Sequence, residues 1–212
     1  MNEFLKNRDQ INQSTRWLKE NGYLSHPLQC KDWELYNVTR AIGQGDLLDM
    51  GADGSFVLHN AKNKKRVGID LALVEGVNKA EGAEYHQGDL MATPFEDGTF
   101  DEIVSCSVIE HAVDLDTFAK ETSRLLKKGG RLIVSFDYWP EPLDTSQIKL
   151  YSLDWSILCK EDVVRLLQVC RETDLALSGP MDWRVEEAVI TPQYCSPANV
   201  SYTFGLLEFI KQ

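Results

Sequence analysis

A glycine turn between two short apolar runs constrains the fold of this chain more than any other feature. The turn runs from Asp49 to Ser55, directly after Leu47–Leu48, and leads into residues able to start a helix. A strand, a glycine turn and a helix together leave free backbone N–H groups at the strand's carboxyl end, where open α/β sheets bind ligands. A second run ends in Asp70, at roughly the spacing, about twenty residues, of an acid that binds ribose hydroxyls. The pattern therefore predicts a nucleoside-bearing cofactor.

Strand-like and helix-like patterns alternate through the rest of the chain. This alternation predicts an α/β fold, a doubly wound and mainly parallel sheet with right-handed crossovers and helices on both faces. The final strand follows a loop instead of a helix, so it can pair antiparallel with its neighbour. After the strand at Leu47–Leu48, further strands are expected at 66–69, 83–87, 101–105, 131–136, 175–177 and 202–209. Helices are expected at 3–20, 32–42, 55–60, 115–126 and 160–172, with a short crossover at 71–80.

The charge of the chain argues against nucleic acid as a partner. The net charge is −11 and the pI is near 4.8, whereas binding to a phosphate backbone requires clustered Lys and Arg. The one basic run, residues 62–66, is more typical of a solvated helix end than of a nucleic-acid patch.

Cysteine usage and the N-terminal residues predict a cytoplasmic protein. The five cysteines form no CxxC pair and cannot all be paired, which argues against a disulfide framework or a zinc site. The first residues lack the basic start and apolar core of a signal peptide, and no apolar run is long enough for a membrane span. No membrane partner is expected, and the oligomeric state is left open.

Five motifs occur in a fixed order between Gly45 and Phe136. They are the glycine turn at 49–55, Gly68–Asp70, Gly88–Leu90, the run 94–101 leading to 107–111, and residues 125–130. In this order they resemble class I S-adenosylmethionine-dependent methyltransferases. The resemblance implies a Rossmann-like, three-layer α/β/α domain with a seven-stranded sheet whose last strand is antiparallel. It also implies S-adenosyl-L-methionine as cofactor and S-adenosyl-L-homocysteine as product.

The resemblance assigns cofactor binding to nine residues: Asp49, Gly51, Asp53, Asp70, Leu71, Asp89, Leu90, Ser107 and Val108. Gly51 would let the backbone approach the methionine part, and Asp70 would accept hydrogen bonds from both ribose hydroxyls, as an acceptor-only carboxylate can. Asp89 would accept from the adenine amino group and the Leu90 N–H would meet the ring. Leu71 and Val108 would lie on either side of the base.

The glycine turn departs from the family's GxGxG pattern. Asp53 and Ser55 replace two glycines, and Lys128 stands where the family usually has proline. Because Asp tolerates left-handed turns and Ser55 could cap the next helix, a shifted turn is expected. A nicotinamide enzyme is disfavoured, since its GxGxxG fingerprint would need a third glycine where Val57 and Leu58 stand.

Methyl transfer from a sulfonium depends mainly on positioning, which can contribute roughly 7–11 kcal/mol in favourable intramolecular models. If the acceptor is a hydroxyl, His111 is the first candidate for a general base and Asp137 the second. Equally, Glu110–His111 could brace the next helix. This pair also resembles part of a magnesium site in related O-methyltransferases, but Ser107 stands where a third ligand is required. No metal is therefore expected.

Aromatic residues outside the motifs are the candidates for acceptor binding: Trp33, Tyr36, Tyr138, Trp139 and Trp155. Each could instead simply cover the edge of the sheet. A third candidate wall comprises Trp183, Glu186, Glu187 and Tyr194.

The sequence thus predicts one domain, residues 1–212. Residues 1–44 would form N-terminal helices or a lid, 45–136 the cofactor-binding core, and 137–212 an acceptor-side insert and C-terminal strands. The expected activity is methyl transfer to a small molecule, at a hydroxyl oxygen. The alternative is a non-catalytic subunit that keeps the cofactor fold.

Overall fold

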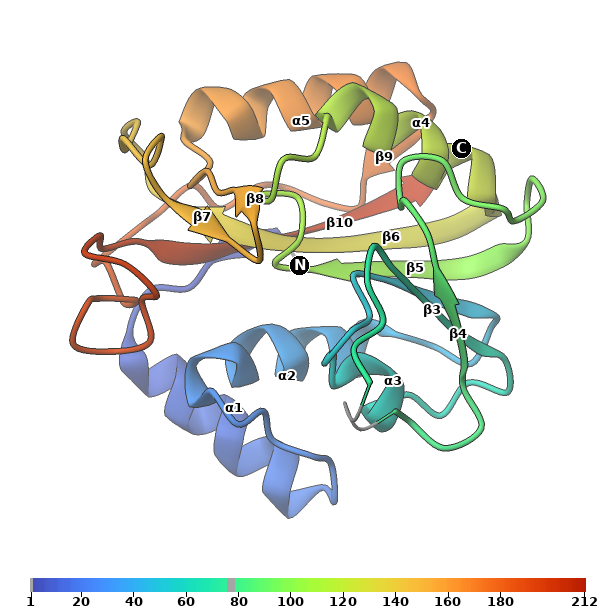
Figure 1. Cartoon of the computed structure of the whole chain (residues 1–212), viewed down its shortest axis with the longest axis horizontal. Helices are drawn as coiled ribbons and strands as arrows, with labels where there is room; N and C mark the ends of the chain where they lie inside the picture. The colour runs from blue at the N-terminus through green and yellow to red at the C-terminus, as the bar shows by residue number, and fades with distance from the viewer. Residues whose placement is uncertain (1, 76–78) are drawn as a thin grey trace.

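A mixed β-sheet forms the middle of three layers in the computed structural model, which describes residues 2–75 and 79–212 (Figure 1). The sheet has eight strands in the order β1-β10-β6-β5-β2-β3-β4, with β9 also paired to β10. The strand bounds are β1 Glu3–Phe4, β2 Leu47–Met50, β3 Arg66–Asp70, β4 Glu84–Gln87, β5 Phe100–Cys106, β6 Leu126–Tyr138, β9 Leu175–Leu177 and β10 Thr203–Lys211. A separate hairpin joins β7, Lys149–Leu150, to β8, Leu153–Asp154.

Strands β2 to β6 are parallel and β10 runs antiparallel to β6, as the sequence predicts. The carboxyl ends of β2, β3, β4 and β5 therefore meet at one edge of the sheet, which is the edge where such folds bind ligands. The residues that end these strands, and the loops that follow them, carry the motifs at 49–55, 68–70, 88–90 and 107–111.

The N-terminus differs from the sequence-based expectation. The helix expected over 3–20 begins only at Arg8, and Glu3–Phe4 instead form β1, which pairs antiparallel with β10. The Phe4 side chain is fully buried and stacks on Tyr138, with ring centroids 3.8 Å apart. Burial of this ring favours a strand over another helical turn, and the sheet gains an eighth strand over the seven that the family resemblance implies.

Helices cover both faces of the sheet (Figure 1). α1, Arg8–Glu20, α2, Asp32–Ala41, and α3, Val57–Asn60, lie on one face, while α4, Leu115–Leu125, and α5, Lys160–Glu172, lie on the other. Local capping defines several starts: Asn7 accepts a hydrogen bond from the Gln10 N–H, and Asp114 accepts one from the Thr117 N–H. Each face encloses an apolar core, one around Phe118 and the other around Trp33.

One further boundary differs from expectation. β6 starts at Leu126, directly after α4, and Gly129 at a φ of 77° turns the chain within the strand. The predicted crossover at 71–80 includes residues 76–78, which lie outside the described residues. Within the described part of the chain, no helix is both long and apolar enough to span a membrane.

Candidate active site

The glycine turn after β2 adopts a conformation that only glycine accommodates easily. Gly51 has a φ of 88° and Gly54 a φ of 74°, so the two left-handed positions fall on the two glycines and not on Asp53. The N–H groups of Gly51 and Ala52 donate to the Ile69 carbonyl at 2.8 and 3.1 Å, which fixes the turn against β3. A Cβ on Gly51 would lie 2.2 Å from Cγ2 of Val108.

Asp70, at the end of β3, holds the same turn from the other side. One of its carboxylate oxygens accepts the Asp53 N–H at 2.9 Å, and the other accepts the Ala72 N–H at 3.3 Å. The Asp53 carboxylate pairs with Lys79 and accepts the Val74 N–H at 3.2 Å. The two replaced glycines are thus accounted for: Asp53 contributes ionic contacts, and the Ser55 hydroxyl accepts the Val57 N–H at the start of α3.

Asp49 is a buried carboxyl group beside this turn. It is 1% exposed, and neither oxygen has a hydrogen-bond partner of good geometry among residues 2–75 and 79–212. Burial raises the pKa of Asp49 to about 7, the nearby Ser55 hydroxyl opposes the shift, and the charge of Asp70 adds to it. An acceptor group buried without a partner fits a cationic ligand group, such as the ammonium of a bound methionine moiety.

The other residues assigned to the cofactor lie along the same edge. Asp89 is exposed after β4 and accepts the Met91 N–H at 2.8 Å, whereas Leu90 is buried in the core. Leu71 is 50% exposed after β3, and Val108 is half-buried after β5. The hydroxyl of Ser107, also placed in the cofactor set, accepts a hydrogen bond from Lys31 and donates one to Glu34.

His111 lies in the turn after β5 and contacts the hairpin that follows β6. It forms a β-bridge with Trp155, and its ring meets Tyr151 edge-on at 5.5 Å. Burial and the charge of Lys31 lower the pKa of His111 to about 4, so the imidazole is neutral at pH 7.

Three carboxyl groups surround one lysine near the carboxyl ends of β5 and β6. We call this group the carboxylate cluster, and it consists of Lys31, Glu34, Glu110 and Asp137. Lys31 ends the 3₁₀ turn η1, Gln29–Lys31, and its ammonium lies 3.2 Å from Glu34 Oε2. Glu34 Oε1 accepts hydrogen bonds from the hydroxyls of Ser107 and Ser135, at 2.7 and 2.5 Å. These contacts join α2 to β5 and β6.

Two members of the cluster have unpaired oxygens. The Trp155 indole N–H donates to Asp137 Oδ2 at 2.9 Å, and the Tyr202 hydroxyl lies near enough to lower the pKa of Asp137. Asp137 Oδ1 and both oxygens of Glu110 make no hydrogen bond of good geometry in the described part of the chain. Burial raises the pKa of Asp137 to about 6, although Lys31 opposes the shift, and burial next to Asp137 raises that of Glu110 well above its usual range. Burial alone would lower the pKa of Lys31, but the surrounding carboxyl groups raise it, so the lysine is charged.

The five aromatic residues proposed for acceptor binding do not converge. Trp155 reaches the carboxylate cluster and packs against Tyr202 at 5.7 Å. Tyr138 is 1% exposed and follows Asp137 in β6, so it faces the opposite side of the sheet. Trp33 is 2% exposed in the core under α2; Tyr36 and Trp139 are half-buried.

Sequence reasoning missed Lys31, Glu34 and Tyr202. A signal was available for Glu34, because it lies between Trp33 and Leu35 in a short helix where its neighbours are apolar. No such signal marked Lys31, which contacts Ser107 and Phe204, or Tyr202, which packs on Trp155.

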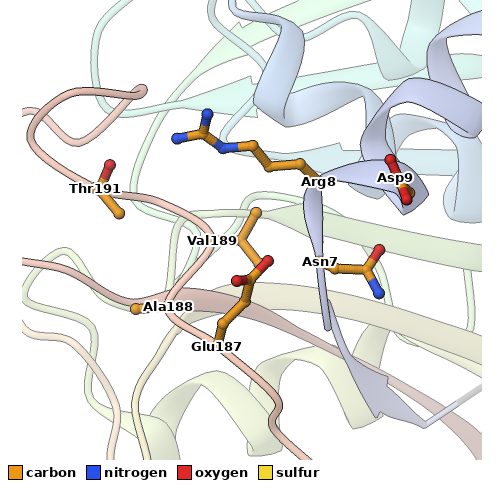
Figure 2. A pocket seen from close by; sticks show the side chains of 7 residues that line it. All are labelled: Asn7, Arg8, Asp9, Glu187, Ala188, Val189 and Thr191. Atoms are coloured by element: carbon orange, nitrogen blue, oxygen red, sulfur yellow. The ribbon is translucent and has the colours of Figure 1, made fainter.

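Two surface hollows lie away from these groups. One, of about 350 Å³, separates the start of α1 from the segment at 187–191, and Figure 2 shows the Arg8 side chain reaching across it toward Thr191. It contains Glu187 of the third candidate wall. The other, of about 360 Å³, lies at the amino ends of β5 and the parallel part of β6. Neither is lined by the carboxylate cluster or the glycine turn.

Comparison with known proteins finds similarity in the segment that contains the glycine turn, Asp70 and Asp89. Residues 48–134 match the family model described as "Methyltransferase domain". The chain is 31% identical over 101 residues to norajmaline N-methyltransferase of Rauvolfia serpentina, covering 42% of this chain and 35% of that protein. It is 36% identical over 89 residues to a ubiquinone/menaquinone biosynthesis C-methyltransferase of Roseobacter denitrificans, covering 39% of this chain and 36% of that protein. The match thus spans about a third of the length of these curated relatives.

Among solved structures, the fold resembles geranyl diphosphate C-methyltransferase from Streptomyces coelicolor A3(2), which was solved with S-adenosyl-L-homocysteine bound. The TM-score is 0.62 at 17% identity, and the match covers 84% of this chain and 78% of that one. The likeness shows a shared fold, and the family match covers the glycine turn, Asp70 and Asp89. The match to the methyltransferase-domain model thus covers residues 48–134, and outside these residues the likeness is one of fold.

Proposed function

We propose that the protein is an enzyme that transfers a methyl group from S-adenosyl-L-methionine to a small molecule. The observation that carries the proposal is the arrangement of Asp49, Gly51 and Asp70 at the ends of β2 and β3. Here a buried unpaired carboxyl group, a left-handed glycine and a second carboxylate surround one turn. This set suits a ligand with a cationic tail and a ribose.

In this proposal the chain's residues mainly bind and orient the donor, which supplies an activated methyl group when bound. Asp70 keeps lone pairs free for the ribose hydroxyls, since each of its oxygens accepts only one backbone N–H. Asp89, Leu90, Leu71 and Val108 are assigned to the adenine, and Asp49, Asp53 and Ser107 complete the expected set of cofactor contacts.

For the acceptor we keep the hydroxyl oxygen predicted from the sequence, with Asp137 as the preferred general base. A carboxyl group with a pKa of about 6 is largely ionised at neutral pH and still basic enough to take a proton in the transition state. His111, with a pKa of about 4, is a weaker base, and we assign it second rank. Trp155 would orient Asp137 through its indole N–H.

Each of the three parts of the chain has a separate role in this proposal. Residues 45–136 hold the donor and residues 137–212 supply Asp137 and Trp155 on the acceptor side. Residues 1–44 cover the site, and the contacts of Lys31 and Glu34 with Ser107 and Ser135 support that role. Trp33, Tyr36, Tyr138 and Trp139 are proposed to shape the acceptor side from behind, since they are buried or half-buried.

Calorimetric titration with S-adenosylmethionine and S-adenosylhomocysteine tests the proposal. Asp70→Ala removes an acceptor of two charge-assisted hydrogen bonds, each worth about 1.5–3 kcal/mol, so we expect donor affinity to fall at least a hundredfold. Asp144→Ala is the matched control, because Asp144 likewise accepts an N–H two residues on, from Ser146. Unchanged affinity in Asp70→Ala would contradict the proposed donor site.

Donor binding without turnover of any small-molecule pool would favour the alternative, a non-catalytic subunit. Turnover is measured by transfer of label from methyl-labelled S-adenosylmethionine to an extract of small metabolites. Salt-sensitive RNA binding in a gel-shift assay would contradict the choice of a small-molecule acceptor.

A further inference from the structure

We infer that the acceptor carries a protonated amine, which the carboxylate cluster binds through Glu110 and Asp137. The inference rests on the proposed methyl transfer and narrows its substrate class to cationic small molecules. It concerns recognition of the amine and leaves the choice of methylated atom to the experiment.

The composition of the cluster gives the first reason. Three carboxyl groups, Glu34, Glu110 and Asp137, are each less than 5% exposed, and all three raise the pKa of Lys31. Lys31 is committed to Glu34 by its ion pair at 3.2 Å. Glu110 and Asp137 therefore share this one lysine with Glu34, and the buried site has an excess of acid.

Unpaired atoms in the cluster give the second reason. Glu110 is fully buried, and neither of its oxygens has a hydrogen-bond partner within the described ranges 2–75 and 79–212. Asp137 Oδ1 makes no hydrogen bond of good geometry there, although the Tyr202 hydroxyl lies near enough to lower the pKa of Asp137. A buried acceptor without a donor is unfavourable, so the Glu110 oxygens, which lie beside Asp137, call for a donor. An alkylammonium has three N–H donors and no acceptor, and it therefore matches this set.

The surroundings of Lys31 show which groups at this site contact an ammonium. The Lys31 ammonium lies 3.2 Å from Glu34 and 4.1 Å from the centre of the Phe204 ring. Trp155 and Tyr202 continue this aromatic wall next to Asp137, with ring centroids 5.7 Å apart. Carboxylates combined with aromatic faces are the chemistry by which proteins bind organic cations.

The most exposed side chain of the carboxylate cluster is Lys31. The Lys31 side chain is 25% exposed and Ser107 is half-buried, whereas the carboxyl groups lie deeper. Among the residues described, no three His, Cys, Asp or Glu side chains are placed to hold a metal ion together. This spacing favours an organic ammonium, which uses separate hydrogen bonds, over a divalent cation that needs converging oxygens.

The test uses the full chain and a small-molecule extract of yeast separated by ion exchange into cationic, neutral and anionic pools. Each pool is incubated with the protein and methyl-labelled S-adenosylmethionine. We expect the label in the cationic pool, in a product that a cation exchanger retains. Mass spectrometry of that product then assigns the methyl group to nitrogen or to a hydroxyl oxygen of the same molecule.

Variants connect the result to the cluster. Glu110→Gln and Asp137→Asn keep side-chain size but remove a charge or a proton acceptor, so labelling of the cationic pool should fall at least tenfold. Donor affinity should stay within twofold for Glu110→Gln. Glu121→Gln is the matched control, a buried glutamate paired with Arg124 on α4, and should label as the unmodified chain does.

Labelling of the neutral or anionic pool alone would overturn the inference and leave the proposed methyl transfer intact. Unchanged labelling in both cluster variants would also overturn it. Absence of donor binding in calorimetry would instead overturn the proposed function itself. Donor binding without label in any pool would count against both.

Discussion

Replacing Gly51 by alanine should destabilise the fold in two ways, through the left-handed backbone at this residue and through the close approach of Val108. At a φ of 88°, an alanine pays roughly 1–2 kcal/mol for the left-handed conformation, and about 0.4–1 kcal/mol of this is recovered because the unfolded chain is less flexible. The new Cβ would also lie 2.2 Å from Cγ2 of Val108, and such overpacking costs about 1–3 kcal/mol. We therefore expect Gly51→Ala to lower the free energy of unfolding by about 2–4 kcal/mol.

Gly54→Ala is the matched control for the backbone cost. Gly54 has a φ of 74° in the same turn, and a Cβ there would meet no atom within 4 Å. Its replacement should cost only about 1 kcal/mol. Val108→Ala should cost a similar amount alone, since it removes two half-buried methyl groups, each worth at most about 0.8 kcal/mol. Combined with Gly51→Ala it should restore about 1–3 kcal/mol, because the overlapping atom is gone.

Urea denaturation followed by tryptophan fluorescence measures the four free energies, and calorimetry with S-adenosylhomocysteine measures the matching affinities. Affinity should fall in Gly51→Ala and remain near normal in Gly54→Ala. Equal stability losses in the two glycine variants, or an additive double variant, would refute the close approach of Val108 to the turn.

Three further outcomes follow from single side chains. The pKa of Asp49 is about 7 in the folded protein and roughly 3.9 in an unfolded chain. Its contribution to the free energy of unfolding is therefore greatest below pH 4 and is lost as pH rises through 7. Asp49→Asn should remove this decline, which urea titrations at pH 5 and pH 8 would measure. Trp155→Phe removes a hydrogen bond that lowers the pKa of Asp137, so the acidic limb of the kcat/KM profile should move to higher pH; an unmoved limb would exclude Asp137 as the base. Phe4→Ala should cost about 3–5 kcal/mol in thermal or urea unfolding if its ring is packed on Tyr138, and almost nothing if the segment is loose.

The cofactor half of the fold was predictable because it depends on local signals. Glycines at 51 and 54, and the acids Asp70 and Asp89 at or just after the next two strands, are readable in order along the chain. α4 and α5 also match their predicted ranges to within a residue, since both have regular apolar spacing and acidic first turns.

The acceptor half was not predictable, because it is assembled from distant segments. The carboxylate cluster joins residues 31 and 34 to 110 and 137, and no periodicity within one element indicates that they meet. Tyr138 illustrates the limit: it has the chemistry of a pocket residue, but the alternation of β6 turns it away from Asp137 and onto Phe4. Two-residue strands such as β1 are similarly too short for any pattern to reveal.

The pairing of β1 with β10 has a consequence during synthesis on the ribosome. Glu3 lies opposite Leu206 and Phe4 opposite Gly205. β1 therefore cannot pair until β10, about 200 residues later in the chain, has been synthesised. At about 5–20 residues per second, Phe4 stays without its place in the sheet for roughly 10–40 seconds, while the central parallel strands are already available. Closure of the sheet edge therefore has to follow the synthesis of β10, and a nascent chain stalled before β10 would expose this ring to chaperones.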